Sequence, residues 1–217
     1  RDRPTPHQVV LFFPGSGVID RRSYADLDIG SIDFLVRGGR VVAFPVFRGT
    51  FERGTGLRSD IQNETNDWRD HVLAWATDLR RSVDYMATRD DLDLDRLAFL
   101  GVSWGGAMAP IMTALEQRIR VNVIWVGGLL MQETQPAVDP FHFLPRVRQP
   151  TLMVSAKWDS FYPLETAQRP FFENLGTPPD QRRMVIIDAN HGVLSYDRDR
   201  VVRETLDWLD QYLGPVR

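Results

Sequence analysis

The residues best suited to chemistry belong to a glycine-rich turn around Ser103. Residues 101–106 read Gly-Val-Ser-Trp-Gly-Gly, which matches the pattern Gly-x-Ser-x-Gly. The turn stands between an apolar strand-like run and an apolar helix-like run, the context in which a nucleophilic serine occupies a sharp strand-to-helix turn. Glycine neighbours let the chain bend there and keep the serine exposed. Small residues could also serve only close helix packing, but the flanking runs favour a nucleophile.

A serine hydroxyl is a weak nucleophile, so a base must take its proton, and histidine is the usual base near neutral pH. Of the four histidines we favour His191, which follows the apolar run 184–188. Its place at the carboxyl end of an expected strand is where open α/β sheets position ligands and chemistry. The other three, His7, His71 and His142, are interpreted as structural or solvated.

The histidine in turn needs a carboxylate that orients it. Asp159 follows another apolar run and lies 56 residues after Ser103 and 32 residues before His191. The rivals are Asp188, three residues before the histidine, and Asp139 in a loop-rich stretch. Residues as close as Asp188 and the histidine seldom face each other suitably on one turn, so we favour Asp159. The order serine, aspartate, histidine differs from both major serine protease orders.

Acyl transfer also requires hydrogen-bond donors for the negatively charged oxygen of the tetrahedral intermediate. One expected donor is the backbone N–H that follows the nucleophile, which belongs to Trp104. The other is expected from the loop Pro14-Gly15-Ser16-Gly17, after the first apolar run. Ser16 is the first choice and Gly17 the alternative, although the same residues could form only a tight turn.

Aromatic residues surround these groups in the sequence. They are Phe47, Phe51, Trp104, Phe141, Phe143, Trp158, Phe161 and Tyr162. Most aromatic side chains in any fold belong to the core. We therefore assign the expected substrate pocket to the three on the loop around Asp159, namely Trp158, Phe161 and Tyr162.

The hydrophobic pattern supplies a scaffold of alternating strands and helices. Strands are expected at 8–13, 40–46, 96–102, 121–126, 151–155 and 183–188, and helices at 29–37, 66–88, 104–118, 164–175 and 201–213. Asn66 or Asp67 is expected to cap the helix 66–88, and 127–149 reads as loop-rich. The alternation indicates βαβ units in a mostly parallel sheet with helices on both faces. Continuous apolar runs fit strands covered on both sides.

Length and composition exclude several classes of protein. A chain of 217 residues with 43% apolar and 25% charged residues is ordinary globular material, and one domain is expected. The net charge is −3 with no basic block, so a nucleic-acid partner is not expected. The absence of cysteine excludes a thiolate nucleophile and cysteine zinc sites. Residues 97–115 carry no charge, but internal glycine and proline favour a buried strand and helix over a membrane span.

Together the motifs resemble the α/β-hydrolase family over nearly the whole chain. The matching segments are FFPGSG at 12–17, GVSWGG at 101–106, KWDSFYP at 157–163 and NHG at 190–192. More narrowly, FPVFRGTFER, VDPFHFLPRV, SFYPLETAQRP and LDWLDQYLGPV look like the hydrolase domain fused behind bacterial serine/threonine protein kinases. Such domains are similar to dienelactone-hydrolase and prolyl-oligopeptidase-like esterases. The resemblance implies an α/β-hydrolase fold and ester hydrolysis by Ser103, Asp159 and His191, with no metal or organic cofactor.

Two residues depart from the family pattern. Pro14 replaces the histidine that many lipases and esterases carry in the oxyanion loop, which leaves the second donor open between Ser16 and Gly17. Trp104 is a bulky residue after the nucleophile, and it is expected to narrow the acyl or alcohol pocket.

The resemblance also bears on the start of the chain, which begins at Arg1 without methionine. The strand 8–13 corresponds to the third strand of the family fold, so the first two strands, an antiparallel pair, are expected upstream in a longer chain. Without them the strand 40–46 would be an exposed apolar edge, which is an aggregation hazard. Upstream residues, such as a kinase-like domain of the same polypeptide, or a partner are expected to cover it.

The leading expectation is a carboxylesterase that acts on small-molecule esters of small to medium acyl groups. A peptidase or acyl-peptidase would use the same machinery. A ligand-sensing module that kept the fold and lost turnover is the third candidate, because fold alone does not determine function.

Overall fold

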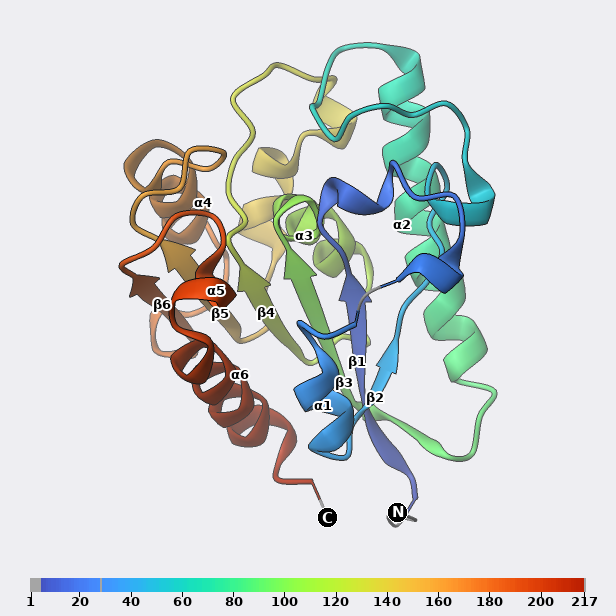
Figure 1. The fold of residues 1–217 in the computed structure, drawn as a ribbon, viewed down its shortest axis with the longest axis vertical. Helices are drawn as coiled ribbons and strands as arrows, with labels where there is room; N and C mark the ends of the chain where they lie inside the picture. The colour runs from blue at the N-terminus through green and yellow to red at the C-terminus, as the bar shows by residue number, and fades with distance from the viewer. Residues whose placement is uncertain (1–4, 28, 217) are drawn as a thin grey trace.

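Six parallel strands form one sheet in the computed structural model, which describes residues 5–27 and 29–216 (Figure 1). The strands are β1 (His7–Phe13), β2 (Val41–Ala43), β3 (Leu92–Val102), β4 (Val121–Trp125), β5 (Thr151–Ala156) and β6 (Arg182–Ile187). Their order is β2-β1-β3-β4-β5-β6, and each neighbouring pair runs parallel. The chain changes direction across the sheet between β1 and β3, and such a switch point leaves a crevice beyond the carboxyl ends of the strands.

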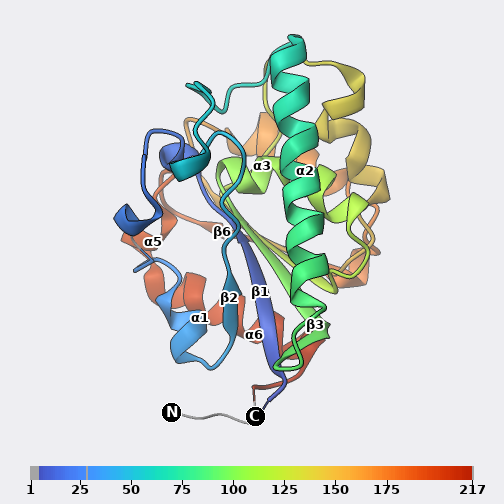
Figure 2. The ribbon, with the colours of Figure 1, turned by 90° about the vertical axis from the view of Figure 1, so that its right-hand side faces the viewer.

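Helices cover both faces of the sheet, as expected (Figure 2). One face carries α1 (Asp33–Arg37), α5 (Val193–Tyr196) and α6 (Arg198–Leu213), and the other carries α2 (Asn66–Met86), α3 (Trp104–Leu115) and α4 (Arg169–Glu173). Successive side chains of a strand point to opposite faces. In β1, Leu11 and Phe13 therefore join the core under α2 and α3, while Val10 and Phe12 join the core under α1 and α6.

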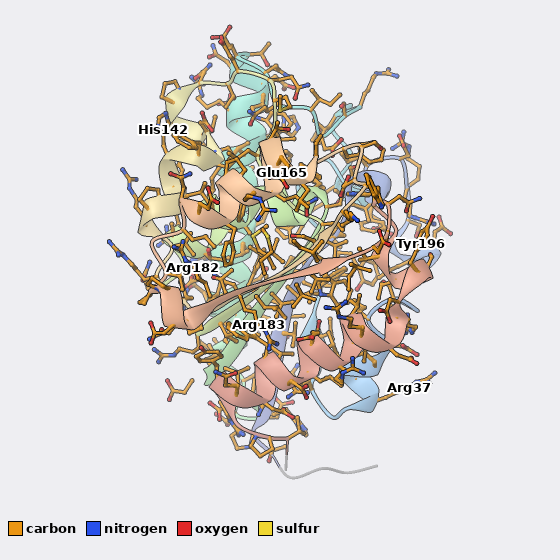
Figure 3. All side chains as sticks on the ribbon, turned by 90° about the vertical axis from the view of Figure 1, so that its left-hand side faces the viewer. Arg37, His142, Glu165, Arg182, Arg183 and Tyr196 are labelled. Atoms are coloured by element: carbon orange, nitrogen blue, oxygen red, sulfur yellow. The ribbon has the colours of Figure 1, made fainter. Side chains whose placement is uncertain are left out.

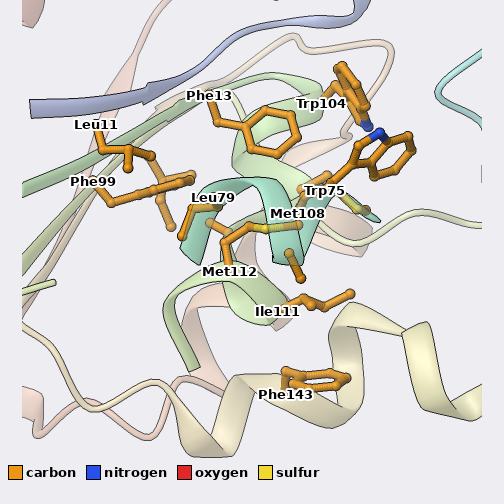
Figure 4. Close-up of a cluster of buried hydrophobic side chains, with 14 of the residues drawn as sticks. Leu11, Phe13, Trp75, Leu79, Phe99, Trp104, Met108, Ile111, Met112 and Phe143 are labelled. Atoms are coloured by element: carbon orange, nitrogen blue, oxygen red, sulfur yellow. The ribbon is translucent and has the colours of Figure 1, made fainter. Parts of the chain in front are cut away.

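The core under α2 and α3 is rich in aromatic rings close to Ser103 (Figure 4). The ring of Phe13 stacks on Phe47 at 4.2 Å and meets Trp104 edge-on at 4.9 Å. Trp75 of α2 meets Trp104 at 4.8 Å. Each such pair contributes about 0.5–1.5 kcal/mol beyond the burial of its surface. These aromatic contacts pack against Trp104 and so support the turn that follows β3.

Several boundaries differ from the expectation for local reasons. β3 starts at Leu92 instead of 96, because Leu92 and Asp93 pair with the start of β1. The expected helix 164–175 is a π-helical turn, Leu164–Gln168, followed by α4. Pro170 sits in the first turn of α4 and has no N–H with which to continue the preceding turn.

The start of α2 is capped by a different residue from those expected. The Oγ1 atom of Thr65 accepts a hydrogen bond from the backbone N–H of Trp68 at 3.2 Å. Thr65 has extended backbone angles, whereas Asn66 and Asp67 already lie inside the helix. The expectation of a cap at Asn66 or Asp67 was therefore wrong by one or two residues, because a cap must itself stand outside the helical geometry.

β2 forms one edge of the sheet and is shorter than the expected strand 40–46. It pairs with β1 alone among the described residues, and Pro45 follows it closely without an N–H to donate. A cavity of about 580 Å³ lies between this edge and α2, bordered by Val41, Phe44 and Tyr85. The covering of this edge by upstream strands or by a partner stays a prediction.

Candidate active site

Ser103 lies on the turn between β3 and α3, with a backbone geometry that few residues adopt. Its φ is 53° and its ψ is −111°, in a region that favours glycine and costs about 1–3 kcal/mol for other residues. Its backbone N–H is held by the carbonyl of Trp125 at 2.9 Å. Strain of this kind persists only where neighbouring structure imposes it, as on the sharp turn of a nucleophile.

The glycines of this turn are required by close backbone contacts. A Cβ atom on Gly105 would lie 2.1 Å from the carbonyl oxygen of Phe13. A Cβ atom on Gly101 would lie 2.5 Å from the carbonyl oxygen of Gly105. Because real Cβ atoms do not approach backbone oxygen so closely, only glycine lets α3 start directly against β1 and β3.

The structure brings Ser103, His191 and Asp159 together in one hydrogen-bonded chain. The Nε2 atom of His191 lies 2.8 Å from Ser103 Oγ, and its Nδ1 atom lies 2.8 Å from Asp159 Oδ2. The Asp159 carboxyl group is fully buried, and the His191 side chain is 24% exposed. A base that is oriented by a buried carboxylate and reaches a strained serine can deprotonate that serine for attack.

Asp159 is held by its own loop, and the two rival carboxylates lie elsewhere. Its second oxygen, Oδ1, accepts the backbone N–H groups of Phe161 at 2.9 Å and Tyr162 at 3.0 Å. Asp188 is largely exposed and accepts a hydrogen bond from the Trp158 indole at 2.7 Å. Asp139 accepts the backbone N–H of Phe141 at the start of a 3-10 helix.

The other histidines have structural surroundings. His71 of α2 is buried, with Nε2 2.7 Å from the Thr55 hydroxyl and Nδ1 2.8 Å from the carbonyl of Asp67. His142 is exposed on the 3-10 helix Pro140–Arg146, and Figure 3 shows it at the outer surface. His7 begins β1 and pairs with Leu92. In the part of the chain that the structure describes, none of these three forms a hydrogen bond to Ser103.

The loop after β1 lies directly against the nucleophile. A Cβ atom built on Gly15 would lie 3.5 Å from Ser103 Cβ. The backbone N–H groups of Ser16, Gly17 and Trp104 donate to no other described residue. Trp104 is the first residue of α3, so its N–H also carries the partial positive charge of a helix start. These groups can donate to an oxyanion, and Ser16 and Gly17 both stay candidates for the second donor.

The expected aromatic residues divide between the core and the site. Phe47, Phe51 and Trp104 are almost completely buried, so the Trp104 indole packs into the core and does not project into an open pocket (Figure 4). Phe143 is also a core residue, whereas Phe141 is exposed.

The three aromatic residues of the loop around Asp159 differ in exposure, and two of them contact the His191 ring. The Phe161 ring lies 4.9 Å from the His191 ring although 71% of Phe161 is exposed. Trp158 is 65% exposed and stands against the Lys157 ammonium at 4.7 Å. Tyr162 is only 3% exposed, with its ring 5.9 Å from His191. One exposed ring, that of Phe161, and one buried ring, that of Tyr162, therefore lie beside His191.

Sequence reasoning missed the residue that holds this loop in place. Gln168 is fully buried, and its Nε2 atom donates to the carbonyls of Tyr162 at 2.7 Å and Ala156 at 3.0 Å. Its Oε1 atom accepts the N–H of Ala156 at 3.3 Å. A single glutamine on an expected helix carries no pattern that reveals this role, so only the folded contacts identify it.

The described residues contain no group of three or more histidine, aspartate or glutamate side chains arranged to hold a metal ion. Within the same part of the chain, no helix is long and apolar enough to cross a membrane.

Comparisons with known sequences point to hydrolases. Residues 27–124, less than half of the chain, match the prolyl oligopeptidase family. Cutinase 2 of Thermobifida cellulosilytica is 24% identical over 159 residues, which cover 69% of this chain and 56% of that protein. The chain thus spans about half the length of the curated relatives that it matches.

Comparisons with solved structures show the fold. A cold-adapted esterase from an Arctic intertidal metagenomic library has a TM-score of 0.71 at 19% identity, covering 97% of this chain and 84% of that one. Thermogutta terrifontis esterase 2, phosphonylated by sarin, has a TM-score of 0.68 at 17% identity with the same coverage. The chain therefore has the α/β-hydrolase fold. These likenesses do not bear on a fused kinase domain, which stays a prediction.

Proposed function

We propose that the protein is a serine hydrolase that cleaves carboxylic esters with small to medium acyl groups. The observation that carries this proposal is the hydrogen-bonded chain from Ser103 through His191 to Asp159, built on turns after β3, β6 and β5. A strained serine with an oriented base is the arrangement that nucleophilic acyl transfer requires. The similarity to a cutinase and to two esterases supports an ester as the substrate.

The reaction then proceeds through an acyl-enzyme. Ser103 Oγ attacks the ester carbonyl carbon while His191 Nε2 takes its proton, and Asp159 stabilises the resulting imidazolium. The carbonyl oxygen becomes an oxyanion that accepts the N–H groups of Trp104 and of Ser16 or Gly17. His191 gives the proton to the departing alcohol, and a water molecule, activated by the same histidine, releases the acid and restores Ser103.

The exposed aromatic rings beside the base support an apolar substrate. The Phe161 ring lies 4.9 Å from the His191 ring, and the exposed Trp158 contacts Asp188 and Lys157. An acyl or alcohol group that packs on these rings removes apolar surface from water, at about 25 cal/mol for each Å² buried. The affinity for substrate is thus expected to rise with the apolar size of the ester.

A peptidase is a second candidate, because the chain matches the prolyl oligopeptidase family over residues 27–124. That match includes Ser103 but neither Asp159 nor His191. The same triad and oxyanion donors would cleave an amide, so the distinction depends on measured rates for esters and amides.

The decisive experiment combines labelling with turnover. The protein is incubated with a fluorophosphonate probe, then with p-nitrophenyl acetate, butyrate and laurate and with matching p-nitroanilides. We expect Ser103→Ala to abolish labelling and ester hydrolysis, and Ser82→Ala on the surface of α2 to leave both unchanged. Faster cleavage of the anilides than of the esters would favour the peptidase.

Two results would overturn the proposal. Undiminished hydrolysis by Ser103→Ala would mean that another group is the nucleophile. A wild-type protein that is neither labelled nor active would instead be a ligand-sensing module with a hydrolase fold.

A further inference from the structure

The side-chain amide of Gln168 closes the loop that carries Asp159. Its Nε2 atom donates to the carbonyl of Ala156 at 3.0 Å and to that of Tyr162 at 2.7 Å, and its Oε1 atom accepts the N–H of Ala156 at 3.3 Å. Ala156 is the last residue of β5, and Asp159 lies midway between Ala156 and Tyr162 in the chain. One fully buried side chain therefore joins the end of the strand to the far end of the loop.

Glutamine is the side chain whose donors and acceptor match these partners. Carbonyl oxygens only accept hydrogen bonds and a backbone N–H only donates, so two carbonyls and one N–H need two donors and one acceptor. An uncharged amide supplies all three, whereas a carboxylate has no donor and an ammonium has no acceptor. Because Gln168 is fully buried, loss of its amide would leave buried backbone groups unpaired.

A π-helical turn brings this amide against the loop. The turn spans Leu164–Gln168, and the N–H of Gln168 reaches the carbonyl of Pro163, five residues back, at 3.3 Å. Glu165 and Arg169 of the same segment pair with each other at 2.7 Å in exposed positions. Turns of this kind are rare and are frequent at functional sites. The segment thus buries one polar side chain between two charged residues that pair at the surface.

The closed loop presents the carboxylate of Asp159 to His191. Asp159 Oδ1 accepts the N–H of Tyr162 at 3.0 Å, and the carbonyl of the same tyrosine accepts from Gln168 at 2.7 Å. Asp159 Oδ2 lies 2.8 Å from His191 Nδ1. A displacement of the loop at Tyr162 would therefore move the carboxylate relative to the imidazole.

We propose that Gln168 is a positioning residue of the active site, whose side-chain amide keeps Asp159 at hydrogen-bonding distance from His191. The proposal deepens the proposed function and rests on it. Gln168 acts through the loop, because the Asp159 carboxylate stabilises the imidazolium that forms when His191 takes the proton of Ser103. A displacement of about 1 Å at such a site can lower the rate about 100-fold. Since the imidazolium forms only during the reaction, the loss belongs to kcat and not to KM.

The first test removes the hydrogen bonds and keeps the volume of the side chain. Gln168→Met is compared with Gln149→Met. Gln149 is a second buried glutamine, at the opposite end of β5, and its Nε2 atom donates to the carbonyl of Thr113 at 2.8 Å. Hydrolysis of p-nitrophenyl butyrate gives kcat and KM, and urea unfolding gives the stability of each variant. We expect Gln168→Met to lower kcat about 10- to 100-fold with KM within about twofold, and Gln149→Met to destabilise the fold but keep the wild-type kcat.

The second test asks whether Gln168 acts through Asp159. Gln168→Met is introduced into the wild type and into Asp159→Asn, and the rate of fluorophosphonate labelling is measured for the four proteins. Groups that act as a unit have non-additive effects. We therefore expect Gln168→Met to slow labelling about tenfold or more in the wild type but less than about twofold in Asp159→Asn, which has already lost the carboxylate. A side chain that served only packing would slow both backgrounds by the same factor.

Three outcomes would overturn the proposal. They are a wild-type kcat in folded Gln168→Met, equal slowing of labelling in the two backgrounds, and an equal loss of kcat in Gln149→Met. If Gln168→Met does not fold, Gln168→Asn, which keeps the amide on a shorter side chain, replaces it in both tests with the same outcomes decisive. Failure of the proposed function is distinguishable, because the wild type itself would then show neither turnover nor labelling.

Discussion

At the scale of single residues, the site depends on which of two neighbouring carboxylates faces the base. Asp159 and Asp188 both follow strands and both lie near His191 in the chain or in the fold. Asp159 is fully buried. One of its carboxylate oxygens accepts two backbone N–H groups, and the other contacts His191. Asp188 is largely exposed and accepts a hydrogen bond from the Trp158 indole. Burial and the prepared donors single out Asp159, because only a fixed carboxylate keeps the imidazole in one tautomer.

This difference predicts opposite results for two conservative substitutions. Asp159→Asn should lower kcat about 10³- to 10⁴-fold, because the amide favours the wrong histidine tautomer. Asp188→Asn should stay within about twofold of the wild type, since an exposed contact contributes little. Steady-state hydrolysis of p-nitrophenyl butyrate measures both. Comparable losses in the two variants would contradict the assignment of Asp159.

At the scale of elements, α2 organises the long loop that precedes it. The indole of Trp75 donates to the carbonyl of Arg48 at 2.7 Å, and His71 contacts Thr55 at 2.7 Å. The same Trp75 ring packs on Trp104 beside the nucleophile. The stability of α2 is therefore linked to the loop 47–64 and to the packing of Trp104 beside Ser103. The first helical turn of α2 depends on the cap at Thr65.

Removal of that cap is the element-scale prediction. Thr65→Ala should lower the free energy of unfolding by about 1 kcal/mol, because one N–H of the first turn loses its acceptor. Asn66→Ala, one residue further along, should cost less than about 0.5 kcal/mol, since its contacts are exposed. Urea unfolding followed by circular dichroism measures both. A larger loss for Asn66→Ala would restore the capping role that the sequence suggested.

At the scale of the whole molecule, a buried polar cluster joins the first strand to the last helix at the end opposite the site. Gln8 of β1 donates to the carbonyl of Gly214 at 2.7 Å and accepts from Arg40 Nε at 3.1 Å. Arg40 is buried and also pairs with Asp210 of α6. Both ends of the described chain thus meet at one edge of the fold (Figure 1). Buried polar groups of this kind are costly unless all are paired.

This cluster predicts a loss of stability without a loss of chemistry. Gln8→Leu should lower the free energy of unfolding by about 1–3 kcal/mol, because the carbonyl of Gly214 loses the donor that Gln8 supplies. Gln117→Leu, at an exposed glutamine after α3, should change it by less than about 0.5 kcal/mol. Denaturant unfolding and kcat are measured on the same samples. A lower kcat in fully folded Gln8→Leu would show that this end of the molecule is coupled to the site.

The fold class and a candidate triad could be predicted from residue types and their spacing. The Gly-x-Ser-x-Gly turn, the order of Ser103, Asp159 and His191, and the alternation of strands and helices are local patterns of residue type and period. The close contact at Gly105 shows why such a pattern is strict, since any side chain there would strike β1. The parallel sheet with helices on both faces followed from the same patterns.

Which side chains meet depends on how the strands and loops pack in the folded chain. The packing of Trp104 against Phe13 and Trp75 and the contact of His191 with Ser103 depend on segments that are far apart in the chain. Contacts of this kind are set by strand order, register and the packing of loops at the carboxyl edge of the sheet. A local pattern records residue types and periods but not those distances. For that reason the triad could be expected from the 217 residues of the sequence, whereas the burial of Trp104 could be recognised only in the fold.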